Sequence, residues 1–289
     1  MQNRTKGIVY IIMSAFGFAL MAFFVRLGDD YGSQISSFQK SFFRNFIALL
    51  IATAIFIKGP RQLCSDGSSF SKKALFILLL RSAAGCIGIF ANFYALSKIP
   101  IADAMALNKT APFFTVLFSW LFLKEKTYAR QFIAIAVGFA GVLMVIKPSA
   151  SFSADFPAFT ALIGGLGAGI AYTCVRKLGV YKANPAFIVL FFSAFSSIAS
   201  IPFIAGSLEP MTLQQIAILL GAGASAAIGQ FGVTMAYSFA PPRQIAVYDY
   251  SNIIFTGILG FVFFSQIPDA LSLIGFTAII SAALFANRK

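Results

Sequence analysis

Ten stretches of mostly apolar residues recur along this 289-residue chain, and they restrict the fold more than any other feature. Each is close to the roughly 20 residues that an α-helix needs to cross the hydrocarbon core of a bilayer. Charged residues make up only 11% of the chain, too few to cover a water-soluble domain of this size. We therefore predict an all-α polytopic membrane protein with ten transmembrane helices, at residues 7–27, 36–57, 74–97, 100–123, 129–147, 156–178, 184–205, 213–239, 243–264 and 270–287.

The chain also contains an internal duplication. Residues around Pro100 match those around Pro241 at one constant spacing, and a second match, at a slightly longer spacing, links Gly17 to Gly167. Each copy holds five predicted spans, an odd number, so the second copy must be inverted relative to the first. Inverted repeats are typical of secondary transporters. The predicted units are a first five-helix repeat at 7–147, an outer linker at 148–155 and a second five-helix repeat at 156–287.

The loop charges predict the orientation in the membrane. With the N-terminus inside, most Lys and Arg residues of the loops fall on the inner side, which is the positive-inside bias of membrane proteins. We therefore expect both termini to be cytoplasmic in a bacterial cytoplasmic (inner) membrane. The net charge of +13 then reflects topology, so we predict no nucleic-acid partner. The outer loops are predicted to hold Lys98 and Lys147 together with the acidic residues Asp29, Asp30, Asp155, Glu209 and Asp269.

Residues 1–25 combine a basic start with an apolar run, as a signal peptide does. No small-x-small cleavage site follows, so a retained first helix is predicted.

The cysteine and histidine content of the sequence disfavours several kinds of chemistry. The three cysteines show neither a disulfide framework nor metal-ligand spacing. The chain has no histidine, which excludes histidine-based triads and the usual zinc sites. We predict no catalytic residue, no metal site and no cofactor.

Charged residues inside the predicted spans give the sharpest functional signal, because each costs about 2.5–3.5 kcal/mol at a helix centre. Arg44, Arg81, Lys109 and Asp249 lie at such depths. Arg81 falls within about two turns of the cytoplasmic end of its span, so we expect its side chain to extend toward the interface. Arg44 and Lys109 are deeper. The excess of basic over acidic groups favours a substrate that carries an anionic group.

The duplication singles out one pair of these positions, because the spacing that relates Pro100 to Pro241 also makes Asn108 equivalent to Asp249. Equivalent positions of inverted repeats meet near the membrane midplane, where such transporters bind substrate. Pro112 is predicted to kink the helix just beyond this cluster. Lys109 and Asp249 either neutralise each other or line a polar cavity, where they hold a substrate or exchange a proton. For the neutral candidates, an interhelical hydrogen bond is the alternative to a ligand contact. The candidate substrate-binding residues are Arg44, Asn92, Asn108, Lys109, Tyr172, Gln230, Tyr248, Asp249 and Asn252, and Asp249 is also the candidate coupling residue.

The chain resembles the EamA-type members of the drug/metabolite transporter superfamily over both halves. The resemblance rests on Ser41-Phe42-Phe43-Arg44, on Ala111-Pro112-Phe113-Phe114 and on Phe122-Leu123-Lys124-Glu125-Lys126. It implies an inner-membrane carrier of two inverted five-helix repeats. It further implies a central cavity built from the first four helices of each repeat, with the fifth and tenth helices peripheral. The second copy departs from the pattern with Gln266 in place of Glu125 and Ile253 in place of Pro112, so functional symmetry is not implied.

The function predicted from these features is secondary transport of a small organic metabolite, amino-acid-like or anion-bearing, by alternating access. Within this class, two alternatives remain: the transport can be proton-coupled through Asp249, and the substrate can be an S-adenosylmethionine-type nucleoside metabolite. A polytopic membrane enzyme acting on lipid-linked substrates is the alternative class, and the lack of histidine and of clustered carboxylates disfavours it. We therefore predict that the chain is not an enzyme. The expected partners are the lipid bilayer and the small-molecule substrate, with the chain a monomer or homodimer.

Overall fold

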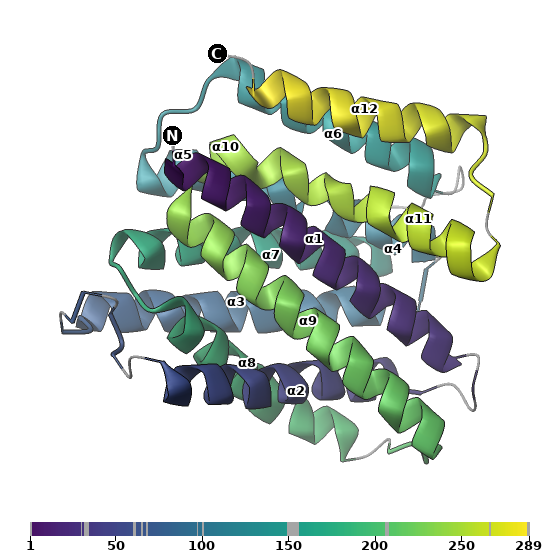
Figure 1. Ribbon diagram of the computed structural model, residues 1–289, viewed down its shortest axis with the longest axis horizontal. Helices are drawn as coiled ribbons and strands as arrows, with labels where there is room; N and C mark the ends of the chain where they lie inside the picture. The colour runs from purple at the N-terminus through teal and green to yellow at the C-terminus, as the bar shows by residue number, and fades with distance from the viewer. Residues whose placement is uncertain are drawn as a thin grey trace.

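The described part of the chain is built almost wholly of helices (Figure 1). A computed structural model describes residues 2–29, 31, 35–59, 62–64, 66–67, 69–96, 98–99, 101–148, 156–205, 208–265 and 267–287. Over these residues the all-helical class is confirmed. The elements are α1 (Gln2–Asp29), α2 (Ser37–Lys58), α3 (Lys72–Leu96), α4 (Ile101–Asn108), α5 (Ala111–Leu123), α6 (Ala129–Ile146), α7 (Phe156–Val180), α8 (Pro185–Ile204), α9 (Leu213–Phe239), α10 (Pro242–Ile245), the 3₁₀ helix η1 (Ala246–Tyr250), α11 (Ser251–Phe264) and α12 (Ala270–Asn287).

Some sequence expectations concern positions outside the described residues. They are the duplication centre Pro100, the predicted outer-loop residues Asp30 and Asp155, Gln266, and all but the first residue of the linker 148–155.

The helices have the length and composition of membrane spans. Within the described ranges, eight segments are long and apolar enough to cross a bilayer, and two shorter apolar helices, α5 and α12, accompany them. Most of these segments coincide with the predicted spans to within a few residues. The chain is a multi-pass membrane protein.

The predicted span 100–123 is not one continuous helix. It breaks at Lys109 and Thr110, between α4 and α5. Pro112 lies in the first turn of α5 and has no N–H to donate to the carbonyl of Asn108, so the regular ladder fails on its N-terminal side. The predicted kink beyond the charged cluster was therefore misplaced, because the break falls within the cluster, at Lys109 itself.

The predicted span 243–264 is also interrupted, at the equivalent position of the second copy. Residues 246–250 form η1, although Ile253 stands where the first copy has Pro112. The side-chain amide of Asn252 donates a hydrogen bond to the Ala15 carbonyl of α1 at 2.9 Å, and η1 packs against α1, α5, α6 and α12. Tertiary contacts therefore hold this irregular segment without a proline.

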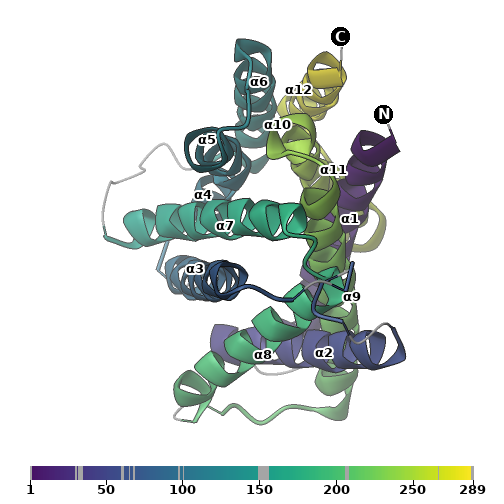
Figure 2. The ribbon, with the colours of Figure 1, turned by 90° about the vertical axis from the view of Figure 1, so that its left-hand side faces the viewer.

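The long helices pair across the two halves of the sequence. α1 packs along α9, α3 along α7, α2 along α8 and α6 along α12, and each pair joins one helix from either half. Figures 1 and 2 both show α6 beside α12 at one edge and α2 beside α8 at the opposite edge. The start of α1 and the end of α12 lie at the same end of the bundle (Figure 1). The two halves thus interlock and are not separate bodies.

Glycines permit the closest of these helix contacts. A Cβ atom at Gly17 of α1 would lie 2.6 Å from the backbone nitrogen of Gly229 in α9. A Cβ atom at Gly167 of α7 would lie 2.9 Å from the Cα of Gly88 in α3. The two contacts correspond through the duplication, which relates Gly17 to Gly167 and Gly88 to Gly229. Small residues let helix backbones approach closely in lipid, where dispersion and not the hydrophobic effect drives association.

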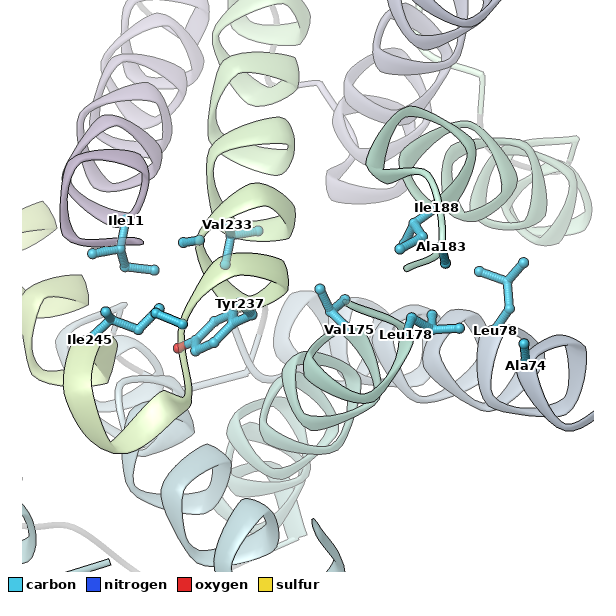
Figure 3. Packing of buried hydrophobic residues seen from close by; sticks show 12 residues of the cluster. Ile11, Ala74, Leu78, Val175, Leu178, Ala183, Ile188, Val233, Tyr237 and Ile245 are labelled. Carbon is cyan, nitrogen blue, oxygen red and sulfur yellow. The ribbon is translucent and has the colours of Figure 1, made fainter. Parts of the chain in front are cut away.

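A buried cluster joins five of the long helices where the pairs meet. Figure 3 shows Ile11 of α1 and Tyr237 of α9 facing Ile245, while Val175 and Leu178 of α7 extend the cluster toward α3 and α8. This packing fixes the positions of α7 and α9, which carry candidate residues.

The connecting segments contact one another in two groups, one at each end of the bundle. In each group, residues distant in the sequence are joined by hydrogen bonds or ion pairs. At the end nearer the start of α1, the contacts are Asn184 N to Leu63 O at 2.9 Å, Lys182 to Asp66 at 3.2 Å and Arg176 to Glu125 at 2.7 Å. At the opposite end, Gln39 exchanges two hydrogen bonds with the backbone of Glu209, Gln215 donates to Gly28 O, and Lys147 pairs with Asp269.

We expect Gly17→Ala to destabilise the protein and Gly28→Ala to leave it as stable as the wild type or slightly more stable. A Cβ at Gly17 meets the α9 backbone, whereas one at Gly28 meets only the Ile218 side chain, at an ordinary 3.5 Å. Overpacking of this kind costs about 1–3 kcal/mol, while Ala favours a helix over Gly by about 1 kcal/mol at both sites. Thermal unfolding in detergent measures the difference. Equal stability of the two variants would contradict the close α1–α9 contact.

Asp269 supports a prediction about pH, because it lies in the connection before α12 and is exposed. The hydrogen bond from Lys147, followed by those from Ser272, lowers the pKa of Asp269 to about 2. The stabilisation from this pair should be complete above the unfolded pKa of about 4 and should vanish as the pH falls through 2. Asp269→Asn keeps the helix cap but loses the charge. The melting-temperature gap between wild type and variant should be constant from about pH 7 to 5, begin to narrow near about pH 4 and be lost by about pH 2. A gap of unchanged size at about pH 2 would refute this role.

Candidate functional site

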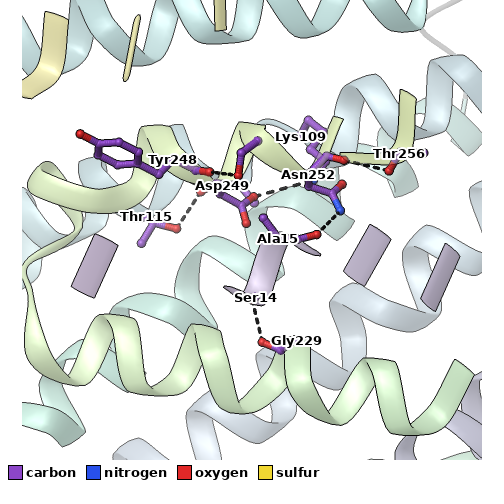
Figure 4. A network of polar contacts seen from close by, with 11 residues as sticks. Ser14, Ala15, Lys109, Thr115, Gly229, Tyr248, Asp249, Asn252 and Thr256 are labelled. Atoms are coloured by element: carbon purple, nitrogen blue, oxygen red, sulfur yellow. Dashed lines mark hydrogen bonds and ion pairs between the residues drawn. The ribbon is translucent and has the colours of Figure 1, made fainter. Parts of the chain in front are cut away.

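The two irregular segments bring opposite charges together. The ammonium of Lys109, at the break between α4 and α5, lies 3.8 Å from Oδ2 of Asp249 in η1. Both side chains are largely buried, with 16% of Lys109 and 13% of Asp249 exposed. Figure 4 shows the two side chains together with Asn252, close to Ala15 of α1. The sequence placed this pair at membrane depth, and the structure brings its charged atoms into contact.

The geometry of the pair leaves hydrogen-bonding capacity unused. Charge-assisted N–H···O bonds are about 2.7–2.9 Å long, so a separation of 3.8 Å is an ion pair without a direct hydrogen bond. Within the described part of the chain, the Lys109 ammonium donates no hydrogen bond and the Asp249 carboxylate accepts none. An ammonium has three donors and a carboxylate about four acceptor positions. The pair can therefore accept a third group, either a substrate atom, a water molecule or a proton, without dismantling existing bonds.

Short polar contacts fix the segment that carries Asp249 (Figure 4). Asn252 donates to Ala15 O, and its own carbonyl accepts a hydrogen bond from Thr256 at 2.8 Å. Ser251 donates to the Tyr248 carbonyl at 2.7 Å. Inside a membrane, freed backbone groups need such partners. The amide of the candidate residue Asn252 is thus engaged in holding η1 against α1.

Tyr248 and Arg44 lie against different helices. The Tyr248 hydroxyl donates to the Ala283 carbonyl of α12 at 3.2 Å, so this candidate faces the last helix. The Arg44 side chain is half-buried on α2, with its guanidinium 5.8 Å from the centroid of the Phe18 ring.

Tyr172 connects the acidic and basic parts of the interior. Its ring stacks on that of Tyr237 from α9, with the ring centroids 5.2 Å apart and the ring planes inclined by 24°. Tyr172 lies close enough to Asp249, Arg44 and Arg81 to interact with each electrostatically. The Tyr237 side chain is fully buried. The two rings therefore form a platform within reach of both charge types.

The other three amide candidates, Asn92, Asn108 and Gln230, lie on α3, α4 and α9. Asn92 and Asn108 both pack on Gly164 of α7, where an added Cβ would lie 3.2 Å from Asn92 Cβ and 3.1 Å from Asn108 Nδ2. Asn92 Oδ1 and the Nε2 of Gln230 are buried without a hydrogen-bond partner in the described structure. Buried amide atoms usually have partners, so these two are available to a ligand.

Arg81 departs from its predicted behaviour. Its side chain does not extend to the interface but is 2% exposed, with the guanidinium 3.6 Å from the centroid of the Phe192 ring of α8. α3 begins at Lys72, so Arg81 lies nine residues, or about 13 Å, inside the helix. Gly85, one turn further along, leaves room for the Phe192 ring. The signal that the sequence did offer was the excess of membrane arginines over membrane acids.

An open groove of about 100 Å³ lies between α1 and α11, where Phe23, Arg26 and Thr256 contribute to its lining. None of the nine candidate residues lines this groove. No group of three His, Cys, Asp or Glu side chains among the described residues could hold a metal ion.

Comparison with known proteins adds independent information. A sequence profile of the EamA-like transporter family matches residues 5–147 and 155–288. The chain is 29% identical to the pseudopaline exporter CntI of Pseudomonas aeruginosa, covering 98% of this chain and 96% of that protein. It is 25% identical to an S-adenosylmethionine uptake transporter of Rickettsia bellii (88% and 84% covered) and 27% identical to a riboflavin transporter of Brucella anthropi (86% and 87%). A solved crystal structure shares the fold at a TM-score of 0.76 and 15% identity, covering 95% of this chain and 96% of that one.

We expect the Lys109–Asp249 pair to be energetically coupled. Lys109→Met or Asp249→Asn leaves the other group buried and unpaired, which should cost up to about 3 kcal/mol, and the double variant should recover much of the loss. The exposed pair Lys182–Asp66 is the control, since exposed pairs contribute about 1 kcal/mol or less. For each pair, thermal unfolding of the wild type, the two single variants and the double variant (a double-mutant cycle) gives the coupling energy. Additive losses at Lys109 and Asp249 would show that the two charges do not interact.

Proposed function

The chain belongs to the EamA-like transporter family, and on this premise we propose that it is a secondary transporter of a small organic metabolite, working by alternating access in the bacterial cytoplasmic membrane. The observation that carries the proposal is the buried Lys109–Asp249 pair, formed where two interrupted helices meet. Charged groups at such depth are costly, and in membrane proteins they mark substrate and ion pathways. The named relatives described above are transporters, which supports the same class.

We propose ten spans with both termini cytoplasmic. In this topology α4 and α5 together form the fourth span, and α10, η1 and α11 together form the ninth. The contacts of the connecting segments support it, because residues joined at one end of the bundle all fall on the predicted inner side. Those joined at the opposite end all fall on the predicted outer side. The common location of the start of α1 and the end of α12 agrees with an even number of spans (Figure 1).

An inverted repeat follows from this topology. Five spans per copy require the second copy to be upside down. The pairing of each long helix with one from the other half supports the repeat, as do the matching glycine contacts of α1 with α9 and of α7 with α3. Interrupted helices at equivalent positions of two inverted repeats are where transporters of this design bind substrate and coupling ions.

Lys109 and Asp249 form the centre of the proposed site. Asn92, Gln230, Tyr172 and Arg44 are the further ligand contacts, whereas Asn252, Tyr248 and Asn108 position the interrupted helices. In one state the two charges pair; a substrate group or a proton then displaces Lys109 from Asp249 as the repeats rock. Asp249 is the proposed coupling residue, because a buried carboxylate that exchanges its partner can take up and release a proton during the cycle.

The substrate is proposed from the charges of the site and not from the relatives. The relatives carry names of different substrates, and those names include both export and uptake. Arg44, Arg81 and Lys109 outnumber Asp249 in the interior, so the site favours an amino-acid-like or anion-bearing metabolite.

Transport by proteoliposomes tests the coupling role. Vesicles are incubated with a mixture of amino acids, nucleosides and organic anions at several pH gradients, and the accumulated compounds are quantified by mass spectrometry. We expect Asp249→Asn to reduce the uptake of the transported compound at least about tenfold and to flatten its pH dependence, consistent with proton-transfer contributions of 10²–10⁴. Asp269→Asn is the control, because it removes a carboxylate outside the membrane, and it should transport like the wild type. Unchanged rate and pH dependence in Asp249→Asn would exclude coupling at this residue.

A further inference from the structure

Arg81 is a buried charge that the described residues compensate only in part. It is 2% exposed, and its Nε and Nη1 atoms have no hydrogen-bond partner in the described part of the chain. No ion pair of Arg81 with an acidic residue is found there either. A buried guanidinium normally has its five donors satisfied and its charge paired. Stacking on Phe192 compensates in part, since a cation over a desolvated ring gains about 2 kcal/mol.

A second arginine shares this region. Arg44 of α2 lies close enough to Arg81 to repel it electrostatically. The neighbouring helices supply hydrogen-bonding groups: Asn45, beside Arg44, donates to Ser196 of α8 at 2.9 Å. Ser197 of α8 is buried, and its hydroxyl has no partner among the described residues. Two mutually repelling cations beside an unpartnered hydroxyl favour the binding of an anion, and no acidic residue in the described part of the chain pairs with either arginine.

The other charged groups of the interior indicate how much negative charge the bound anion should carry. Tyr172 interacts electrostatically with both arginines and with Asp249, so the basic region and the Lys109–Asp249 pair belong to one polar interior. Three cations, Arg44, Arg81 and Lys109, face one acid, Asp249. A bound molecule that carries more acidic than basic groups would neutralise the excess.

We propose that Arg81, with Arg44, binds a carboxylate of the transported metabolite, and that this metabolite carries more carboxylates than amines. The proposal rests on the transport function above and defines its substrate class. The planar guanidinium suits a carboxylate, because two parallel N–H groups bond its two oxygens at once. Arg81 then holds an acidic end of the substrate. Tyr172, stacked on Tyr237, interacts electrostatically with both Arg81 and Asp249.

Thermal stabilisation of the purified protein tests the proposal with matched probes. Succinamide has amides in place of the two carboxylates of succinate, and L-glutamine has an amide in place of the side-chain carboxylate of L-glutamate. Inorganic phosphate serves as a probe for anions other than carboxylates. Ligands that bind the native state raise its melting temperature as their concentration rises. The proteins are the wild type, Arg81→Met, Arg81→Lys and the control Arg176→Met, which removes an arginine paired with Glu125 near the cytoplasmic end.

We expect succinate and L-glutamate to stabilise the wild type and Arg176→Met, while succinamide and L-glutamine do so at least about tenfold more weakly. Arg81→Met should lose at least about tenfold in apparent affinity for both acids. Arg81→Lys keeps the positive charge but lacks the two parallel N–H groups of a guanidinium, so it should also weaken binding. If Arg81→Met does not fold, Arg81→Lys takes its place in the test.

Two kinds of result would overturn the inference. The first is that neither acid stabilises the wild type, or that both stabilise the Arg81 variants equally well. The second is that inorganic phosphate stabilises through Arg81 more strongly than the acids do, which would assign the site to phosphorylated compounds. The transport test is separate: uptake of a neutral or cationic compound that depends on Asp249 would leave the transport function standing and remove this inference alone.

Discussion

The absence of water at membrane depth is the constraint on which the rest of this structure depends. In hydrocarbon, each backbone group must find its partner within the protein, and each charge needs a compensating group. The chain satisfies the first demand with helices almost everywhere and gives up regular geometry at residues 109–110 and 246–250. Both interruptions are enclosed by other helices, and Asn252 and Thr256 supply hydrogen bonds there. Irregular backbone at depth is thus confined to the place where the charges meet.

The same constraint explains the glycines. Without a hydrophobic driving force between helices, close backbone approach is what holds a bundle together in lipid. Gly17 against Gly229 and Gly167 against Gly88 provide it at corresponding positions of the two halves. Because glycine has no side chain to interlock with the neighbouring helix, these contacts also leave smooth surfaces along which the helices can shift relative to each other. The packing that stabilises the fold is therefore compatible with the rocking motion of the proposed transport mechanism.

Much of the fold was predictable from the sequence, because apolar runs near the length of a membrane span have few alternatives. The first interruption was partly predictable, since Pro112 must break the helix on its N-terminal side. The second was not: Ile253 is an ordinary helix residue, and contacts of η1 with distant helices decide its geometry. The duplication and the buried charges pointed to Lys109 and Asp249. The depth of Arg81 was misjudged, because the sequence does not say that Phe192 of α8 covers this face of α3.

In the proposed mechanism, the Lys109–Asp249 region opens alternately to the two sides of the membrane. Ser251→Cys, next to η1 in a chain whose three native cysteines are replaced by alanine, measures this most directly. Membrane-impermeant thiol reagents are applied to right-side-out and to inside-out vesicles. We expect Ser251→Cys to be labelled from either side, with the two labelled fractions shifting in opposite directions when the pH is changed on one side. Labelling from neither side would contradict it, and would make the buried ion pair a static element of helix packing.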